Sequence, residues 1–377
     1  MDPSFTVGIE EEYLLVDLRS GDLVVDPPDE LLADCEKLTD GRVSPEFLKS
    51  QIEVGTRKCD GIKQAAAEIL ELRRLVAEAA GRFGLGPIAA STHPMAAWEV
   101  QKHTDKERYN ILARDMEAVA RRLVICGMHV HVGLDDDDLR LDLLGQVSYF
   151  LPHLLALSTS SPFWRGEKTG LMSYRLAVFD ELPRTGLPEQ FESYGEYQRH
   201  LEIVTGAGVV EDATKLWWDV RPSARFPTLE LRIPDVCTRA RDGFAVAAMY
   251  LCLLRMLWRL KRSNQRWRRY SNMLIQENRW RAQRYGIDQG LIDFGKGIIV
   301  PYADLLEELI ELVEEDAAAL DCVAEVQWTR EILRRKTSAH RQLEIYEAAI
   351  AGGSEKREAF RQVVAFLTQE TLADDAA

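Results

Sequence analysis

The sequence lacks the features that would place it in a membrane, in an oxidising compartment or on nucleic acid. It has no run of about 18 apolar residues, so no membrane-spanning helix is expected. Its six cysteines are scattered and none forms a C-x-x-C pair, which predicts reduced, mostly buried thiols. The formal net charge is −14, whereas a nucleic-acid-binding protein normally carries a basic patch. The acidic start, Met1 to Ser4, does not have the pattern of a signal peptide. We therefore expect a cytoplasmic protein with neither nucleic acid nor a membrane as partner.

The common motifs of nucleotide binding and nucleophilic catalysis are also missing. The chain contains no G-x-x-x-x-G-K-[ST] and no G-x-G-x-x-G segment, so a P-loop or Rossmann site is not expected. Of its seven histidines, only His129 and His131 share a ligand spacing, and a zinc hydrolase would need more imidazoles. The 377 residues are 46% hydrophobic, so the chain can bury a sizeable core.

An alternating stretch near the N-terminus carries the main chemical signal. Residues 5–16 have the period of a half-buried β-strand. Glu10 and Glu12 fall on the polar face, roughly 7 Å apart. Like charges this close repel each other, and a bound cation is the usual reason to gather them, although a solvated strand face gives the same pattern. Glu11 falls on the apolar face, where a carboxylate needs an arginine or another donor, so we interpret Glu11 as structural.

Four further segments have one apolar and one polar face. Their polar faces carry Glu53 and Arg57 in 48–57, His129 and His131 in 124–133, Asp219 and Arg221 in 216–221, and Glu230 and Arg232 in 226–234. If these strands share a sheet, their polar faces line one concave surface. Buried carboxylates need partners to stay ionised, and oxygen ligands with one imidazole suit Mg²⁺ or Mn²⁺. So many carboxylates predict more than one ion, and the arginines would meet an anionic ligand such as a polyphosphate.

Helical periodicity fills most of the remaining chain. We expect a short strand at 88–90 and helices at 62–83, 105–123, 139–158, 242–262, 271–285, 301–320, 324–350 and 355–367. Residues 160–188 are rich in Gly, Pro and Ser and predict an irregular loop, the best candidate for a lid. The helix at 271–285 is interpreted as a solvated face with a Glu277–Arg281 pair. No linker interrupts the chain, so we expect a single domain, 1–377, in which 1–235 carries the sheet and the site and 241–377 is helical.

Five short motifs follow one another along the chain. They are Gly8-Ile9-Glu10-Glu11-Glu12, Gln51-Ile52-Glu53-Val54, Gly127-Met128-His129-Val130-His131-Val132-Gly133, Leu229-Glu230-Leu231-Arg232-Ile233-Pro234-Asp235 and Glu277-Asn278-Arg279-Trp280-Arg281-Ala282. In this order they resemble the glutamate–cysteine ligase type 2 family, also called carboxylate–amine ligases, over residues 6–367. The resemblance implies an α+β, glutamine-synthetase-like catalytic fold: a mostly antiparallel sheet that forms an open funnel, backed by helices, with a helical C-terminal part.

The resemblance also implies roles for individual residues. The metal ligands would be Glu10, Glu12, Glu53, His129 and Glu230, and the groups on the ATP phosphates would be the catalytic Arg221 and Arg232, with His131 nearby. Arg175, in Ser173-Tyr174-Arg175, would bind the amino-acid substrate. Glu46 is left out of the ligand set because its spacing matches only loosely. The implied reaction uses ATP with Mg²⁺ or Mn²⁺ to activate the γ-carboxylate of L-glutamate as an acyl phosphate, which an amine, L-cysteine by default, then attacks.

Two other functions remain compatible with these residues. One is a metal-dependent hydrolase of a γ-glutamyl or phosphate compound on the same scaffold, which would turn over without ATP. The other is a nucleotide-binding or assembly protein that binds ATP but releases no ADP. The motifs name neither the amine nor the carboxylate. The resemblance implies a homo-oligomer, with a dimer as the first expectation.

Overall fold

The computed structural model describes residues 3–373 and centres on one antiparallel sheet of seven strands. The strands are β1 (Val7–Asp17), β2 (Val43–Pro45), β3 (Gln51–Gly55), β4 (Leu85–Ile88), β5 (Met128–Gly133), β10 (Val220–Pro222) and β11 (Thr228–Leu231). Their order is β10-β11-β5-β1-β3-β2, and β4 also pairs with β1. The expected combination of a mostly antiparallel sheet with helices is therefore confirmed.

Strand β1 lies at the middle of this sheet and holds three partners. Residues 7–11 pair with β5, residues 10–14 with β3 and residues 14–17 with β4. Leu14 pairs with both Gln51 and Ile88, so β4 and β3 lie on opposite edges of β1. Because β1 is paired on both edges, its alternation of side chains decides what each face of the sheet presents.

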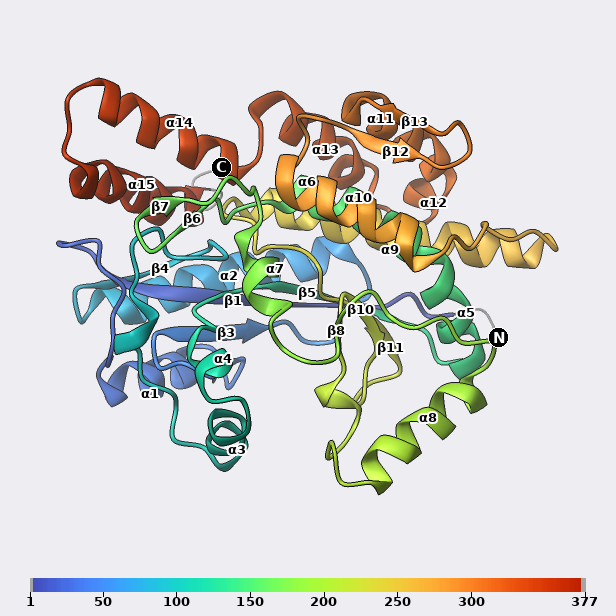
Figure 1. Cartoon of the computed structure of the whole chain (residues 1–377), viewed down its shortest axis with the longest axis horizontal. Helices are drawn as coiled ribbons and strands as arrows, with labels where there is room; N and C mark the ends of the chain where they lie inside the picture. The colour runs from blue at the N-terminus through green and yellow to red at the C-terminus, as the bar shows by residue number, and fades with distance from the viewer. Residues whose placement is uncertain (1–2, 374–377) are drawn as a thin grey trace.

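The apolar face of the sheet is covered by helices. Helix α2 (Ile62–Gly81) contacts β1 and β4, and α9 (Ala240–Arg262) contacts α2 and β5. Figure 1 shows the helices from α9 onward as a layer on one side of the sheet, with α1, α3, α4 and α8 on the other. Helix α9 is long and apolar enough to cross a membrane by length and composition, but 78% of its apolar window is buried inside the molecule. It is the central helix of the core.

Glu11 is anchored on this apolar side. Its carboxylate is fully buried and forms a double ion pair with Arg73 of α2, with Nε–Oε2 and Nη2–Oε1 distances of 2.8 Å. The Tyr13 hydroxyl also donates to Glu11. Arg73 donates in addition to the carbonyl oxygens of Cys237, Thr238 and Thr371. The prediction that Glu11 is structural and needs an arginine is confirmed.

Several helices differ from the periodicity-based expectation. Helices α1 (Asp29–Leu38) and α8 (Tyr194–Gly206) occupy segments for which no helix was expected. The helix expected at 105–123 is divided into α3 (Glu107–Met116) and α4 (Ala118–Arg121) by Glu117, whose φ is +43°. The helix expected at 324–350 is divided into α13 (Val323–Arg335) and α14 (Ser338–Ala351) by Lys336, with φ +67°. A left-handed residue cannot continue a right-handed helix, and the apolar period alone does not reveal it.

The remaining elements correct three further expectations. The segment 160–188 contains β6 (Phe163–Trp164), β7 (Glu167–Lys168), α7 (Tyr174–Phe179) and β8 (Thr185–Gly186), so it is not an irregular loop throughout. The C-terminal part includes a hairpin of β12 (Leu291–Asp293) and β13 (Ile298–Val300) and is therefore not wholly helical. The strand expected at 88–90 is β4, which begins at Leu85.

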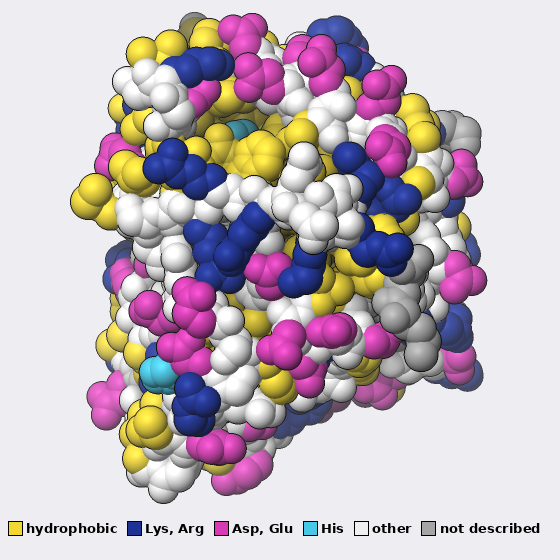
Figure 2. Space-filling view, turned by 90° about the vertical axis from the view of Figure 1, so that its right-hand side faces the viewer, with side chains coloured by type: hydrophobic (Ala, Val, Ile, Leu, Met, Phe, Trp, Pro, Cys, Tyr) yellow, Lys and Arg dark blue, Asp and Glu magenta, His cyan; other side chains and the backbone are white. Residues whose placement is uncertain are grey.

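The other helices complete the description. They are α5 (Asp137–Val147), α6 (Leu151–Ser158), α10 (Asn272–Tyr285), α11 (Tyr302–Leu312), α12 (Glu314–Ala319) and α15 (Lys356–Thr371). Figure 2 shows Lys and Arg side chains gathered on the face that carries the end of α9. Lys261 in the last turn of α9, and Arg266 and Arg269 beyond its end, pair with Asp142 of α5. Cations near a helix C-terminus are stabilised by its dipole, so this patch has a local structural cause.

Candidate active site

The polar face of the sheet forms one wall of a cavity of about 460 Å³. The nine residues to which the family resemblance gave a role all line it: Glu10, Glu12, Glu53, His129, His131, Arg175, Arg221, Glu230 and Arg232. The strand register explains the assembly. Glu10 pairs across to His129, Glu12 to Glu53, and Glu230 to both His131 and Arg221. Residues two apart on a strand share a face, so the five neighbouring strands β3, β1, β5, β11 and β10 deliver seven of these side chains to one surface, and Arg232 follows directly after β11.

Two residues expected on this face lie elsewhere. Arg57 lies beyond the end of β3 at Gly55, is more than half exposed and pairs with Asp40 at 2.8 Å. Asp219 lies between β9 (Trp217–Trp218) and β10, where it is buried and accepts from Arg279. In both cases the strand ends before the residue in question, so the alternation no longer predicts the direction of the side chain.

The first group of possible metal ligands consists of Glu10, His129 and Glu230. One ligand atom from each of the three lies within 4.8 Å of the others. Burial by itself raises the pKa of Glu10, but hydrogen bonds with His129 and His131 hold that pKa well below its usual range. Burial likewise opposes the charge of Glu230, and the neighbouring guanidinium groups keep its pKa low. Both carboxylates are therefore charged and able to bind a cation at neutral pH.

The second group consists of Glu12, Glu53 and His129, again within 4.8 Å of one another. Burial and the charge of Glu53 raise the pKa of Glu12 to about 7. Burial, with the charges of Glu46 and Glu10, raises the pKa of Glu53 to about 8. These carboxylates repel one another in the protein alone, and a divalent cation would remove the repulsion.

His129 belongs to both groups and is held in the form that binds metals. Burial and the charge of Arg232 lower its pKa to about 4, so the imidazole is neutral at pH 7. Its Nδ1 lies 3.3 Å from Glu10 Oε2, while its buried Nε2 has no hydrogen-bond partner within residues 3–373. The buried Nε2 of His131 has only a long contact, 3.5 Å to Glu10 Oε1. Buried polar atoms normally have a hydrogen-bond partner, so the Nε2 atom of His129 is suited to bind a cation.

Two arginines form the cationic part of the cavity. Arg221 binds Glu230 through two nitrogens, with Nε–Oε2 at 2.8 Å and Nη2–Oε1 at 3.2 Å. Arg232 donates to the same carboxylate. The Nη1 of Arg221 is fixed by the carbonyl oxygens of Thr214 and Leu216. Both guanidinium groups are thus held in place before any anion arrives, as electrostatic catalysis requires.

Arg175 enters the cavity from α7. It is buried and donates to the carbonyl oxygens of Arg232 and Ile233, while its Nε has no hydrogen-bond partner in the described chain. A Cβ atom at Gly127 would lie 2.4 Å from its Nη2, so glycine at this position makes room for the guanidinium. The motif glycine before His129 therefore has a local steric cause.

Other residues of the cavity were missed by the sequence argument. Glu46, left out because of its spacing, follows β2 and lines the cavity, and burial with the charge of Glu12 raises its pKa to about 7. Arg108 and Tyr109 of α3 and Arg225 and Phe226 of the β10–β11 turn also line it. Helix and turn residues do not follow the strand alternation, so only the loose match at Glu46 gave a signal.

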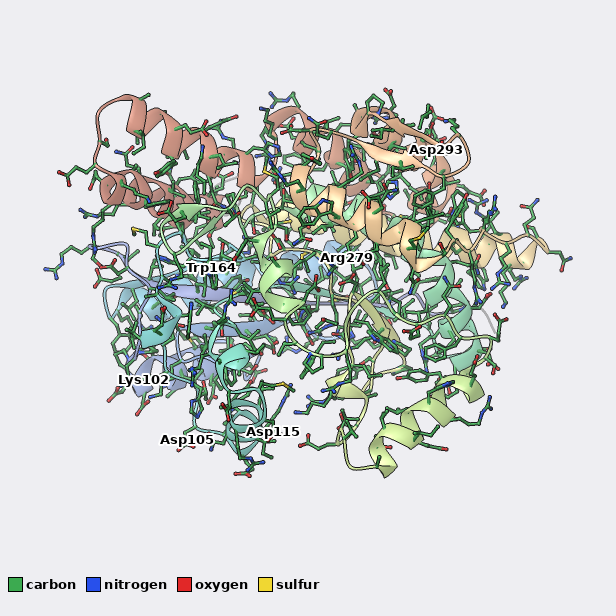
Figure 3. All side chains as sticks on the ribbon, viewed as in Figure 1. Lys102, Asp105, Asp115, Trp164, Arg279 and Asp293 are labelled. Carbon is green, nitrogen blue, oxygen red and sulfur yellow. The ribbon has the colours of Figure 1, made fainter. Side chains whose placement is uncertain are left out.

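Arg279, in the last of the five sequence motifs, is buried inside the protein. Arg279 is 1% exposed and bridges Asp180 at the end of α7 and Asp219 before β10, with Nη1–Oδ2 and Nε–Oδ2 distances of 2.7 Å. It lies at the centre of the molecule in Figure 3. Arg281 donates to the carbonyl oxygens of Gln289 and Gly290. The interpretation of this helix as a solvated face is wrong at Arg279, because its partners are distant in sequence.

Two solved structures share this fold. One is a bifunctional glutathione synthetase from Pasteurella multocida, with a TM-score of 0.69 and 14% identity over 97% of this chain and 52% of that chain. The other is a glutamate–cysteine ligase from Francisella tularensis in complex with AMP, with a TM-score of 0.65 and 16% identity over 98% of this chain and 93% of that chain. At such identities the likeness shows the fold alone, which is the glutamine-synthetase-like fold expected from the sequence.

Relatives closer in sequence define the class and the family. A protein of Rhodospirillum rubrum is 61% identical over 99% of this chain and 97% of its own length. A protein of Jannaschia sp. is 56% identical over 99% of this chain and 98% of its own length. Both carry the provisional name glutamate–cysteine ligase 2. With the fold and site above, the class is an ATP-dependent ligase that forms a carbon–nitrogen bond. Residues 6–365 match the glutamate–cysteine ligase family 2, and the chain belongs to that family.

Proposed function

We propose that this ligase activates the γ-carboxylate of L-glutamate with ATP and joins the acyl phosphate to an amine, with L-cysteine as the default acceptor. The observation that carries the proposal is the pair of ligand groups that share His129, set beside two preorganised arginines in one cavity. Membership of the family supports the reaction class. The specific carboxylate and amine are parts of the proposal.

In this proposal five side chains hold divalent cations, Mg²⁺ or Mn²⁺: Glu10, Glu12, Glu53, His129 and Glu230. Their donor set of carboxylate oxygens and one neutral imidazole suits these ions. Bound cations would neutralise the charge of the ATP phosphates. Glu46 lies beside Glu12 and Glu53 and adds to the negative charge that attracts them. The orphaned Nε2 atom of His129 is the direct structural support for this assignment.

Arg221 and Arg232 then stabilise the phosphoryl group as it moves from ATP to the carboxylate, with His131 nearby. Both arginines are held by Glu230, so no reorganisation is needed when negative charge develops on the phosphoryl oxygens. The Nδ1 of His131 forms a hydrogen bond of 2.9 Å with the Thr228 hydroxyl, which fixes the ring and turns Nε2 towards Glu10 Oε1 at 3.5 Å.

Arg175 would bind a carboxylate of the amino-acid substrate. The amine nitrogen then attacks the acyl carbon: a C–N bond forms, the C–O bond to phosphate breaks, and the amine gives up one proton. The acyl phosphate must be kept from water until this happens. The segment 160–188 supplies Arg175, Phe179 and Leu182 to the cavity, and its role as a lid stays a prediction.

The test is ADP release with Mg²⁺-ATP and L-glutamate, with and without a panel of amines. Release that needs both glutamate and one amine supports the proposal and names the acceptor. Product formation from a γ-glutamyl or phosphate compound without ATP would favour the hydrolase instead. ATP binding with no ADP release under any condition would favour a protein without turnover.

A second test separates metal binding from turnover. Glu12→Gln should weaken Mn²⁺ binding in a calorimetric titration and lower ADP release at least a hundredfold. Glu36→Gln, a change at an exposed glutamate of α1, serves as the matched control and should alter neither. Unchanged Mn²⁺ binding in Glu12→Gln would contradict the assignment of the ligands.

Compartment and assembly complete the proposal. We propose a cytoplasmic homodimer. All six cysteines are buried and free, which suits a reducing compartment. Light scattering coupled to size-exclusion chromatography tests the dimer, since a monomer and a dimer of a 42.8 kDa chain are well resolved.

A further inference from the structure

A second cavity adjoins the reaction cavity. Its volume is about 340 Å³, and it lies between α3 on one side and the segment from the end of α8 to β9 on the other. The two cavities share three lining residues, Leu112, Lys215 and Trp217. Asp115, labelled in Figure 3, marks its α3 side. The two cavities are therefore neighbours, and the side chains of these three shared residues lie at their junction.

The walls of the side cavity are mainly apolar. Ile111, Met116 and Val210 line it together with the shared Leu112 and Trp217. Its cations are already engaged: the Arg184 guanidinium lies 5.4 Å from the Trp217 ring centroid, and Lys215 pairs with Glu211 at 3.4 Å. Asp115, Thr205 and Glu211 also line the cavity, so it offers little to an anion, while its apolar side chains suit an apolar or aromatic group.

The backbone holds Trp217 in its place at the junction. Strand β9 pairs in parallel with β8, and Thr185 lies opposite Trp217. The backbone N–H of Trp217 donates to the carbonyl oxygen of Arg184 at 3.0 Å, and the side-chain Nε of Arg184 donates to the carbonyl oxygen of Lys215 at 3.1 Å. A preformed aromatic wall of this kind costs little entropy when a ligand binds.

We propose that the side cavity binds the side chain of the amine acceptor, and that this acceptor carries an apolar or aromatic group larger than the thiol side chain of cysteine. The inference rests on the proposed function and narrows its acceptor. Glutamate is charged at an ammonium and two carboxylates, so it has no apolar part of this size. Cysteine has only a methylene and a thiol and would leave most of the cavity empty.

The nucleobase of ATP has a different aromatic surface available. Phe226 is 55% exposed in the reaction cavity and lies edge-on to His131, with ring centroids 5.9 Å apart. This places it beside the residues proposed for the phosphates. The side cavity therefore remains for the acceptor.

The test compares acceptors in the ADP-release assay at saturating Mg²⁺-ATP and L-glutamate. The panel is ammonia, L-cysteine, L-leucine, L-phenylalanine and 2-phenylethylamine. We expect at least one amine with an apolar group to exceed L-cysteine in kcat/KM by tenfold or more, since each buried methylene contributes about tenfold or more to discrimination. A kcat/KM for L-cysteine equal to or above that of every apolar amine would overturn the inference and leave the ligase proposal intact.

A variant locates the effect. Val210→Phe fills the side cavity from a buried position and should lower kcat/KM for the preferred amine at least tenfold, with the KM values of ATP and glutamate changed less than twofold. Met116→Ala, which enlarges the cavity, gives a second measurement if Val210→Phe does not fold. Ile203→Phe, on the exposed face of α8 outside the cavity, is the matched control.

A raised KM for ATP alone would show that the base occupies the cavity and would overturn the inference. Absence of ADP release with every amine would overturn the proposed function and this inference with it.

Discussion

Replacing Arg73 with Met should destabilise the protein strongly without altering the cavity. Arg73 and Glu11 are 1% and 0% exposed, and their two hydrogen bonds are both 2.8 Å long. Removing one partner of a buried ion pair costs about 3–5 kcal/mol, because the other charge stays buried and unpaired. The entropy of unfolding of a chain of this size is roughly 0.8 kcal/mol/K, so a loss of about 4 kcal/mol lowers Tm by roughly 5 °C.

Arg74→Met provides the matched control on the next residue of α2. Arg74 is 57% exposed and lies 3.8 Å from Glu78, so its loss should change stability by less than about 0.5 kcal/mol. Denaturant titration followed by circular dichroism gives both values. Glu11 lies on the face opposite Glu10 and Glu12, so ADP release per folded molecule should be unchanged in Arg73→Met. A stability within about 1 kcal/mol of the unmodified protein would refute the reasoning.

Three further predictions concern ligand binding, pH and the buried ion pairs of Arg279. Mg²⁺ with ATP at a hundredfold excess over Kd should stabilise the protein by about 2.7 kcal/mol, and Glu53→Gln should reduce the resulting rise in Tm; no rise with either protein would contradict the site. Burial lowers the pKa of His93 from 6.5 to about 4, so the native state leaves it neutral while the unfolded chain protonates it below pH 6.5. Protonation of His93 in the unfolded chain therefore lowers the free energy of unfolding as the pH falls from 6.5 towards 4, and has no effect above pH 6.5. The difference in the free energy of unfolding between the unmodified protein and His93→Gln should shrink by about 2 kcal/mol from pH 7 to 5 in denaturant titrations. A gap that widens instead would refute this. Arg279→Met should cost about 4 kcal/mol because it leaves Asp180 and Asp219 unpaired. Arg281→Met removes hydrogen bonds to two loop carbonyls and a contact with the Tyr285 ring but leaves no buried charge unpaired, so it should cost clearly less, about 1–2 kcal/mol, by the same titration. Equal losses would show that the ion pairs are not the cause.

The sequence was most informative where side chains alternate along strands. The separation of Glu10 and Glu12 from Glu11 follows directly from the twofold period of a strand, and the structure bears it out on both faces. His129 and Glu230 could be found in the same way because β5 and β11 are regular over their motifs. The position of the cavity wall was thus predictable before any tertiary information.

The failures share a physical cause. Arg57 was placed on the wall because the alternation was extended past Gly55, where β3 ends. Arg279 was predicted to be solvated from the pattern of its own helix, although its ion-pair partners lie 99 and 60 residues away in the chain. Helix breaks at Glu117 and Lys336 depend on a single left-handed residue that is not glycine, and composition gives no warning of that. Local periodicity predicts which side chains share a face of a helix or strand, but it does not predict which distant residues they contact.

The hydrogen bonds of Arg73 also have a consequence for folding during synthesis of the chain. Its guanidinium joins Glu11 in the first strand to the carbonyl oxygens of Thr238 and Thr371, and the side chain of Thr371 accepts from the backbone of Ala89. Strand β1 has all its strand partners only when β5 has been synthesised, and Arg73 has all its hydrogen-bond partners only when α15 has been added. Some 360 residues separate Glu11 from Thr371, so the ion pair of Glu11 and Arg73 acquires its last carbonyl partner long after β1 has been made. Until β5 has been synthesised, residues 7–11 of β1 have one unpaired edge, and this edge of the nascent chain needs protection from pairing with other strands.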